Sequence, residues 1–334
     1  MQRPNSQTQE QVRPRIVDII AEGLSLVLVR PWLLAVPILL DLFYWVGVKI
    51  EPSALIASLI RIVNESDVEN SAEVVKSLEE MTSTDISQMI GFFSPTMLNQ
   101  APRDDIYQLV DRVVWSPSSA GVVVLVSLGL FLMSALVAMI YGVPIGDAIL
   151  GRRRAPMELI RAIVSAWGRF LLLIGLVIGT LIGIAIPLLL VAAIAGVGGI
   201  DLIPLYTMFF LIALVLAIFI TPFVLDAIAL IGAGPIDAIR FGSTIFRANK
   251  LQSVGVVLAL MLVILGLPPI ARPLLANLPG VVIAIVLYAL IVTGFIAASM
   301  LFFVDRLRKW RPELIQVPQT APAFDLLSQG EKHS

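Results

Sequence analysis

The sequence predicts an all-α polytopic membrane protein, a bundle of six transmembrane helices with three cytoplasmic interfacial amphipathic helices and a small helical extracytoplasmic cap. The first observation is a set of six long apolar runs, of which all but one lack charged residues. A helix rises about 1.5 Å per residue, so roughly 20 residues cross a hydrocarbon layer of about 30 Å. The second observation is that 58% of residues are apolar and 14% charged, against about 25% charge in soluble domains. The runs are 32–48, 119–141, 170–195, 203–225, 254–267 and 281–304.

The distribution of arginine and lysine predicts the orientation of these runs. Most of the 23 basic residues lie in the N-terminal segment, in the loops after the second and fourth runs, and in the C-terminal tail. The short loops 196–202 and 268–280 carry only Arg272. Because Lys and Arg are retained on the cytoplasmic side of a membrane, we expect six crossings of the plasma membrane with the N-terminus and the C-terminus in the cytoplasm.

The chain is predicted to form a single membrane domain over residues 1–316, followed by a disordered cytoplasmic tail at 317–334. Residues 51–118 form an insertion between the first two spans, and their excess of acidic residues suits the extracytoplasmic side. Apolar residues at helical spacing predict helices within 55–63 and 106–114. Asp85, with Gln88 three residues later, resembles a capping box. The insertion is either a surface for a protein partner or a simple cover.

The fifth run is the weakest span, because a cluster of prolines begins directly after it at Pro268. A re-entrant segment is the alternative, but five crossings would place the arginine-rich C-terminal stretch outside, against the charge rule. In the third run, Gly175, Gly179 and Gly183 recur every four residues. This spacing lets membrane helices pack closely, and we expect it to serve that purpose.

An internal repeat is indicated by three aspartates, since Asp147, Asp226 and Asp305 lie 79 residues apart and each follows an even-numbered run. Arg161 and Arg240 each lie fourteen residues after the first two of them. We interpret the chain as three parallel units, each an amphipathic helix, an outward span and an inward span. A negative charge at a helix C-terminus opposes the helix dipole. We therefore expect these aspartates to cap the following helix or to pair with Arg161 or Arg240, the alternative being a proton or cation path.

The amphipathic segments 16–30, 156–168 and 235–248 carry apolar residues on one side and, in the last two, arginine on the other. Such helices lie in the membrane interface, where each basic residue gains about 1 kcal/mol near anionic lipids. Two interpretations stay open: the arginines only orient the chain, or they bind anionic lipid head groups specifically. The lipid bilayer is in either case the expected partner.

Asp41 lies about nine residues into the first run, and is the one charge within the six runs. A charged aspartate at the centre of a span costs about 2.5–3.5 kcal/mol. Such a residue faces the protein interior or a wet cavity and is a functional candidate. The alternative is a structural, protonated carboxyl bonded to neighbouring backbone.

The chain contains few of the residue types that enzymes commonly use for catalysis. The chain has no cysteine, and its single histidine is His333 beside the C-terminus. Metal sites with thiolate ligands are therefore excluded, and metal sites or catalytic triads that need histidine are almost completely excluded. No phosphate-binding loop and no nucleophile elbow is present. We expect no enzyme, no cofactor, no metal and no nucleic-acid partner.

Residues 238–249, Ala-Ile-Arg-Phe-Gly-Ser-Thr-Ile-Phe-Arg-Ala-Asn, lead straight into the fifth run. This element resembles one found in bacterial multi-pass membrane proteins of unassigned activity, a group similar to the membrane domain of some glycerophosphodiester phosphodiesterases. The resemblance covers about a third of the chain. It implies a bacterial membrane module of six to eight helices, and no catalytic residue is carried over because the catalytic barrel of those enzymes is absent.

These observations predict a non-enzymatic integral membrane protein that acts as a scaffold or partner subunit, with residues 51–118 as its surface for a protein partner. The alternative is a transporter or channel subunit with Asp41 in a polar path. The candidate functional residues are the polar groups Asp41, Asp147, Asp226, Asp305, Arg161 and Arg240.

Overall fold

The computed structural model describes residues 16–66, 71–100, 112–197 and 202–315. Helices hold 86% of these residues, which confirms the all-α class. The described elements, in chain order, are α1 (Ile16–Val29), η1 (Pro31–Leu34), α2 (Ala35–Val46), β1 (Lys49–Ile50), α3 (Ser53–Glu65), α4 (Ser71–Met81), η2 (Ile86–Gly91), α5 (Met97–Gln100), β2 (Val114–Trp115), α6 (Ala120–Ile149), α7 (Pro156–Val197), α8 (Ile203–Ile231), α9 (Pro235–Ala248), α10 (Lys250–Ala271), η4 (Arg272–Ala276), α11 (Leu278–Trp310) and η5 (Pro312–Leu314).

Five of the described helices are long and apolar enough to cross a membrane: α6, α7, α8, α10 extended by η4, and α11. A sixth crossing exists only if α1 and the segment η1–α2 count as one span, and these two are bent by 97°. The predicted first run, 32–48, corresponds to η1 and α2 and does not count as a crossing without α1. Proline at position 31 cannot donate to the helical ladder and restricts the residue before it, so the chain turns at Arg30. The 12 residues of α2 span only about 18 Å.

The long helix α7 corrects a second prediction. Residues 156–168 were expected to form an interfacial helix separate from the third span, but α7 runs without a break from Pro156 to Val197. No proline interrupts the junction, and a single glycine within a helix is tolerated. The corresponding junction after α9 does break, at Asn249 with φ −134° and ψ 43°.

The N-terminal helix α1 packs on α11 through an unusually close backbone contact. A Cβ added at Gly23 would lie 2.3 Å from the carbonyl oxygen of Gly294. Only glycine permits two helices to approach so closely. The apolar face of α1, with Ile19 and Val27, is buried by this contact.

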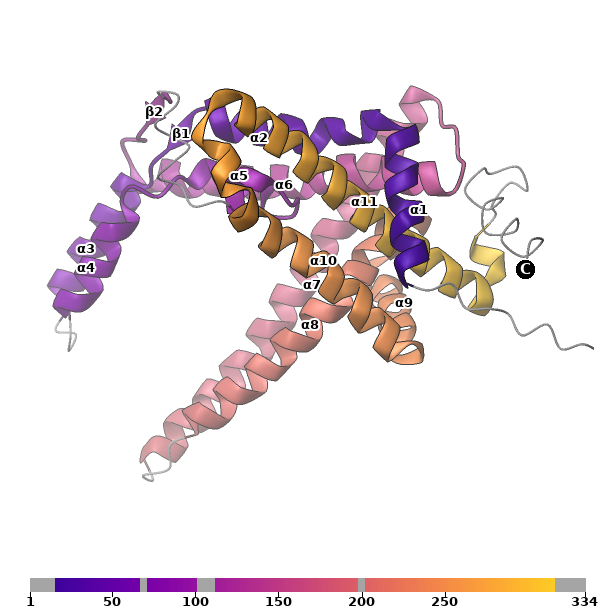
Figure 1. Ribbon diagram of the computed structural model, residues 1–334. Coiled ribbons are helices and arrows are strands. Elements are labelled where there is room, and N and C mark those ends of the chain that lie inside the picture. The colour runs from indigo at the N-terminus through magenta and orange to yellow at the C-terminus, as the bar shows by residue number, and fades with distance from the viewer. Residues whose placement is uncertain (1–15, 67–70, 101–111, 198–201, 316–334) are drawn as a thin grey trace, which may run out of the picture.

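The helices α7 and α8 form a hairpin that projects from the rest of the molecule (Figure 1). Only the N-terminal part of α7 and the C-terminal part of α8 are buried. Apart from the nearby backbone of α7 itself, no atom of the described residues lies within 4 Å of a Cβ built at Gly175, Gly179 or Gly183. The expectation that these glycines pack against another helix is therefore wrong within this chain, because the hairpin separates from its neighbours.

The insertion between α2 and α6 has two parts. The helices α3 and α4 form an arm that projects from the body (Figure 1), whereas η2 and α5 return to it and lie against α2, α6, α10 and α11. Asp85 is the N-cap of η2, as predicted, and accepts a hydrogen bond from the backbone of Ser87. The helix predicted within 106–114 falls mostly outside the described residues, and at its end Val114 belongs instead to β2, which pairs in parallel with β1.

Candidate functional site

Asp41 anchors the returning segment of the insertion. The side chain is fully buried, and its Oδ2 and Oδ1 accept hydrogen bonds from the backbone nitrogens of Met97 at 3.1 Å and Leu98 at 2.9 Å. Both N–H groups belong to the first turn of α5, which lacks helical partners for them. The carboxyl group therefore caps α5 from a different helix. This geometry favours the structural interpretation of Asp41 that the sequence left open.

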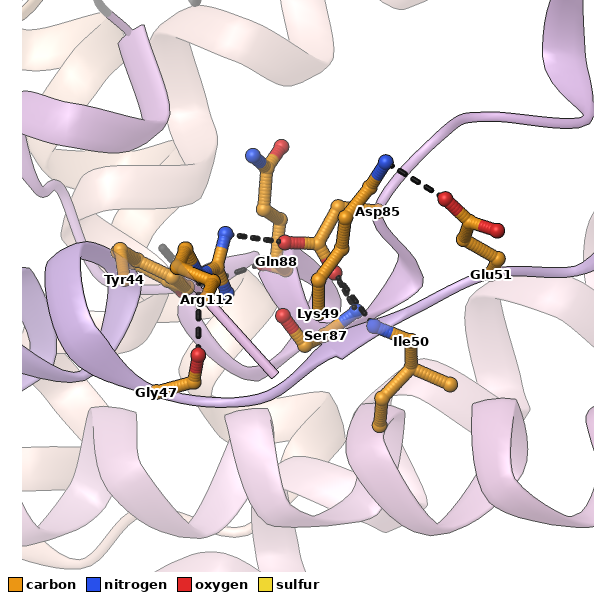
Figure 2. Close-up of polar contacts among 9 residues, drawn as sticks. All are labelled: Tyr44, Gly47, Lys49, Ile50, Glu51, Asp85, Ser87, Gln88 and Arg112. Atoms are coloured by element: carbon orange, nitrogen blue, oxygen red, sulfur yellow. Dashed lines mark hydrogen bonds and ion pairs between the residues drawn. The ribbon is translucent and has the colours of Figure 1, made fainter. Parts of the chain in front are cut away.

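A second buried carboxylate, Asp85, joins three separate segments at the base of the arm (Figure 2). Its Oδ2 lies 2.8 Å from Nη1 of Arg112, and its Oδ1 accepts hydrogen bonds from the backbone of Ile50 and of Ser87. Arg112 also donates through Nε to the carbonyl oxygen of Gly47 at 3.0 Å. We call this group the Asp85–Arg112 clasp. It ties the end of α2, the strand β1 and the start of η2 to the segment that leads into α6.

Asp226 lies beside a cavity within the apolar bundle. Its Oδ2 accepts a hydrogen bond of 2.9 Å from Ser299 of α11, and the side chain is 4% exposed. The cavity has a volume of about 200 Å³ and is lined by α6, α8, α10 and α11 together with Phe93 and Pro95. A carboxyl group beside a mostly apolar cavity could hold a small apolar molecule that carries one hydrogen-bond donor.

A neighbouring polar pair joins α6 to α11 without reaching Asp226. The hydroxyl groups of Tyr141 and Thr293 lie 2.7 Å apart, and Thr293 donates to the carbonyl of Ala289. Sequence reasoning missed Ser299, Tyr141 and Thr293. The only signal was a hydroxyl within an otherwise apolar run, and hydroxyls are common at helix contacts in membranes.

Asp147 and Asp305 find partners close in sequence, and the expected pairing of the aspartates with Arg161 or Arg240 is wrong. Asp147 pairs with Arg154 at 3.0 Å, because the turn after α6 brings this arginine back to the helix end. Asp305 pairs with its neighbour Arg306 at 3.0 Å and with Lys309 one turn later.

The two repeat arginines are both on solvent-facing sides of their helices. Arg240 lies 3.5 Å from Asp237 within α9, and both side chains are exposed. Among the described residues Arg161 makes no hydrogen bond or ion pair, and it lines a cavity beside other arginines. The three aspartates thus occupy different environments, so the sequence repeat does not produce one shared site.

The described part of the chain holds no group of three or more His, Cys, Asp or Glu side chains arranged to hold a metal ion. Comparison of the chain with protein-family models, with curated proteins and with solved structures finds no match. The resemblance to the membrane domain of glycerophosphodiester phosphodiesterases stays a prediction.

Proposed function

We propose that this protein is a non-enzymatic scaffold or partner subunit of the plasma membrane. It crosses the membrane six times, with α1 and η1–α2 together forming the first crossing and both termini in the cytoplasm. Basic residues in the turn after α6, in α9 and at the end of α11 support this orientation. The amphipathic segments 16–30, 156–168 and 235–248 lie at the membrane boundary, the last two with arginines toward lipid head groups, and α3 and α4 project on the extracytoplasmic side.

The α7/α8 hairpin is the observation that carries the scaffold function. In the most apolar 18-residue stretch of α7, no residue is buried within the chain. In the corresponding stretch of α11, 56% of the residues are buried. Large side chains such as Leu189, Ile194 and Leu214 are between 58% and 74% exposed. Membrane helices ordinarily expose apolar side chains to lipid, but these two also separate from the rest of the bundle over most of their length (Figure 1). A detached apolar hairpin suits lateral contact with another membrane helix.

The arm supplies a second surface for a partner. The Asp85–Arg112 clasp fixes the base of α3 and α4 to the membrane body, and the clasp's two side chains are only 4% and 6% exposed. A projecting element with a rigid base suits recognition, because little order is lost on binding. This arrangement supports residues 51–118 as the contact for a protein partner.

Photo-crosslinking in the native membrane tests this function. A photoreactive residue placed at Leu189 or Leu214 is expected to capture a polypeptide, because both positions face outward from the hairpin. The matched control is Leu301, which is 6% exposed within the body and should capture none. Crosslinks from both hairpin positions to lipid alone would contradict the scaffold function.

A transporter or channel subunit is the second candidate, and the cavity beside Asp226 is the observation that favours it. This moves the candidate polar path away from Asp41, whose two carboxyl oxygens accept hydrogen bonds from α5. Flux through the reconstituted protein that is lost in Asp226→Asn and retained in Asp305→Asn, which changes a carboxyl group outside this cavity, would support transport. Absence of flux for ions and small amines in the wild-type protein would remove the candidate.

A further inference from the structure

A cavity of about 370 Å³ lies where the turn after α6, the start of α7 and the end of α8 meet. Its charged lining consists of four arginines and one glutamate, namely Arg152, Arg154, Arg161, Arg169 and Glu158. The volume falls within the range of about 300–1,000 Å³ typical of ligand sites. Because this turn joins membrane-length helices, the cavity lies at the boundary between hydrocarbon and water.

Three of these arginines are fixed by hydrogen bonds or an ion pair within the protein, and each retains further N–H donors. Arg152 donates through Nη1 to the carbonyl of Leu230 at 2.9 Å, and Arg169 donates to the carbonyl of Gly232. Both carbonyls lie at the C-terminal end of α8, where cations are favoured by the helix dipole. Arg154 pairs with Asp147. A guanidinium carries five N–H groups, so each of these arginines retains donors for a ligand.

The positive charge of the cavity is only partly neutralised. Glu158 is the one acidic residue of its lining, and its carboxylate accepts a hydrogen bond from the backbone of Ala155 at the start of α7. Burial lowers the pKa of Arg152, the neighbouring Arg154 lowers it further, and Asp147 raises it in part. A bound anion would stabilise this charged guanidinium, and the forked donors of arginine match the oxygens of a phosphate.

One face of α7 continues from these arginines into exposed apolar residues. Arg161, Ser165 and Arg169 follow one another at four-residue spacing and all line the cavity. At helical periodicity the same face next presents Leu172 and Leu176, which are 66% and 40% exposed. The continuity of α7 across this junction, which the sequence did not predict, creates a surface with arginines at one end and apolar side chains along the rest. An amphiphile with a phosphate head and hydrocarbon tails fits it.

We infer that the cavity lined by Arg152, Arg154, Arg161 and Arg169 binds the phosphate of an anionic phospholipid whose acyl chains lie along α7. Basic pockets between membrane helices recognise such head groups by charge and hydrogen bonding. The inference rests on the membrane placement of the helices and is independent of the scaffold function.

Arg161→Gln is the most informative variant, because Arg161 makes no hydrogen bond or ion pair with the described residues and its loss should leave the fold intact. The matched control is Arg153→Gln, which removes the same charge from the adjacent turn at an exposed position outside the cavity lining. The full-length protein in neutral detergent is titrated with phosphatidylglycerol, and bound lipid is counted by native mass spectrometry. Phosphatidylcholine and inorganic phosphate serve as comparison ligands.

We expect Arg161→Gln to weaken binding of the first phosphatidylglycerol about tenfold or more, the effect of one charge-assisted hydrogen bond. Arg153→Gln should change it by less than about twofold, because this side chain lies outside the cavity lining and contributes only a screened surface charge. Equal losses in the two variants would show diffuse attraction and overturn the inference. Equal affinity for phosphatidylcholine, insensitive to Arg161→Gln, would overturn it as well. Displacement of the lipid by millimolar inorganic phosphate would identify a free-phosphate site and refute the lipid.

Discussion

The Asp85–Arg112 clasp should contribute strongly to the stability of the insertion. Its two side chains are 4% and 6% exposed and lie 2.8 Å apart. Removing one partner leaves the other charge buried, which costs about 3–5 kcal/mol. In Arg112→Met the remaining carboxylate keeps its hydrogen bonds from Ile50 and Ser87, so we expect a loss near 3 kcal/mol at the lower end of that range. Asp85→Ala also orphans those two N–H groups, which places its loss near 5 kcal/mol at the upper end.

A double-mutant cycle measures the interaction itself. The double variant should lose less than the sum of the single losses by about 2 kcal/mol or more, because neither partner is left alone as a buried charge. The free energy of unfolding is measured by titrating the purified protein in mixed micelles with sodium dodecyl sulfate and following helix content.

The nearby pair Lys49–Glu51 gives a matched control. It is also short, at 2.7 Å, but its side chains are 26% and 23% exposed. Lys49→Met should therefore cost no more than about 1 kcal/mol. Single losses at the clasp no larger than this control, or single losses that add in full in the double variant, would refute the reasoning.

Three further predictions concern the body of the fold. Replacing Asp41 with Ala should lower the free energy of unfolding by about 2–6 kcal/mol, since two buried backbone N–H groups each lose a partner at about 1–3 kcal/mol. Asp41→Asn keeps one acceptor oxygen and should lose about half as much stability; equal losses in the two variants would contradict the role of Asp41 as the cap of α5. Gly23→Val should release α1 from α11, because the added Cβ would lie 2.3 Å from the carbonyl of Gly294; unchanged protease resistance of α1 would count against this packing. Gly232→Ala should cost at least about 1 kcal/mol, because φ is +63° and a Cβ would meet Arg169; an unchanged thermal unfolding midpoint would disprove that strain.

The membrane character and most helices could be predicted from the sequence because their cause is local. A run without charge must have its backbone bonded internally in lipid, and a helix does this within one segment. The separation of segment 16–30 from the first run at Arg30 was expected, but whether that segment takes part in the first crossing was not predictable. A proline after an arginine either kinks a span or ends it, and only the packing of α1 on α11 decides between these.

The partners of the buried aspartates depend on contacts that leave no trace in a single sequence. Asp41 caps a helix more than fifty residues away through backbone N–H groups, and any residue type supplies these. Asp226 meets Ser299 across 73 residues of chain. The equal spacing of Asp147, Asp226 and Asp305 predicted equivalent environments, but the turns that follow them differ, and so do their partners.

The arginine cavity shows the same division between local and distant causes. The cluster at 152–154 is evident in the sequence. The approach of Arg152 and Arg169 to the carbonyls at the end of α8 depends on how α6, α7 and α8 come together. Charge patterning could therefore indicate a basic boundary, whereas the cavity required the fold.

Membrane topology in intact cells tests the central claim most directly, and the absence of cysteine from the chain makes it accessible. Single cysteines are introduced at described positions in the five successive connections and near the C-terminal end of α11, and are probed with a membrane-impermeant maleimide. We predict that the first, third and fifth positions react in intact cells, and that the others react only after permeabilisation. Reaction of any two consecutive positions from the same side of the membrane would contradict the account. The positions, in order, are Ser77, Arg153, Leu202, Ile236, Leu274 and Lys309.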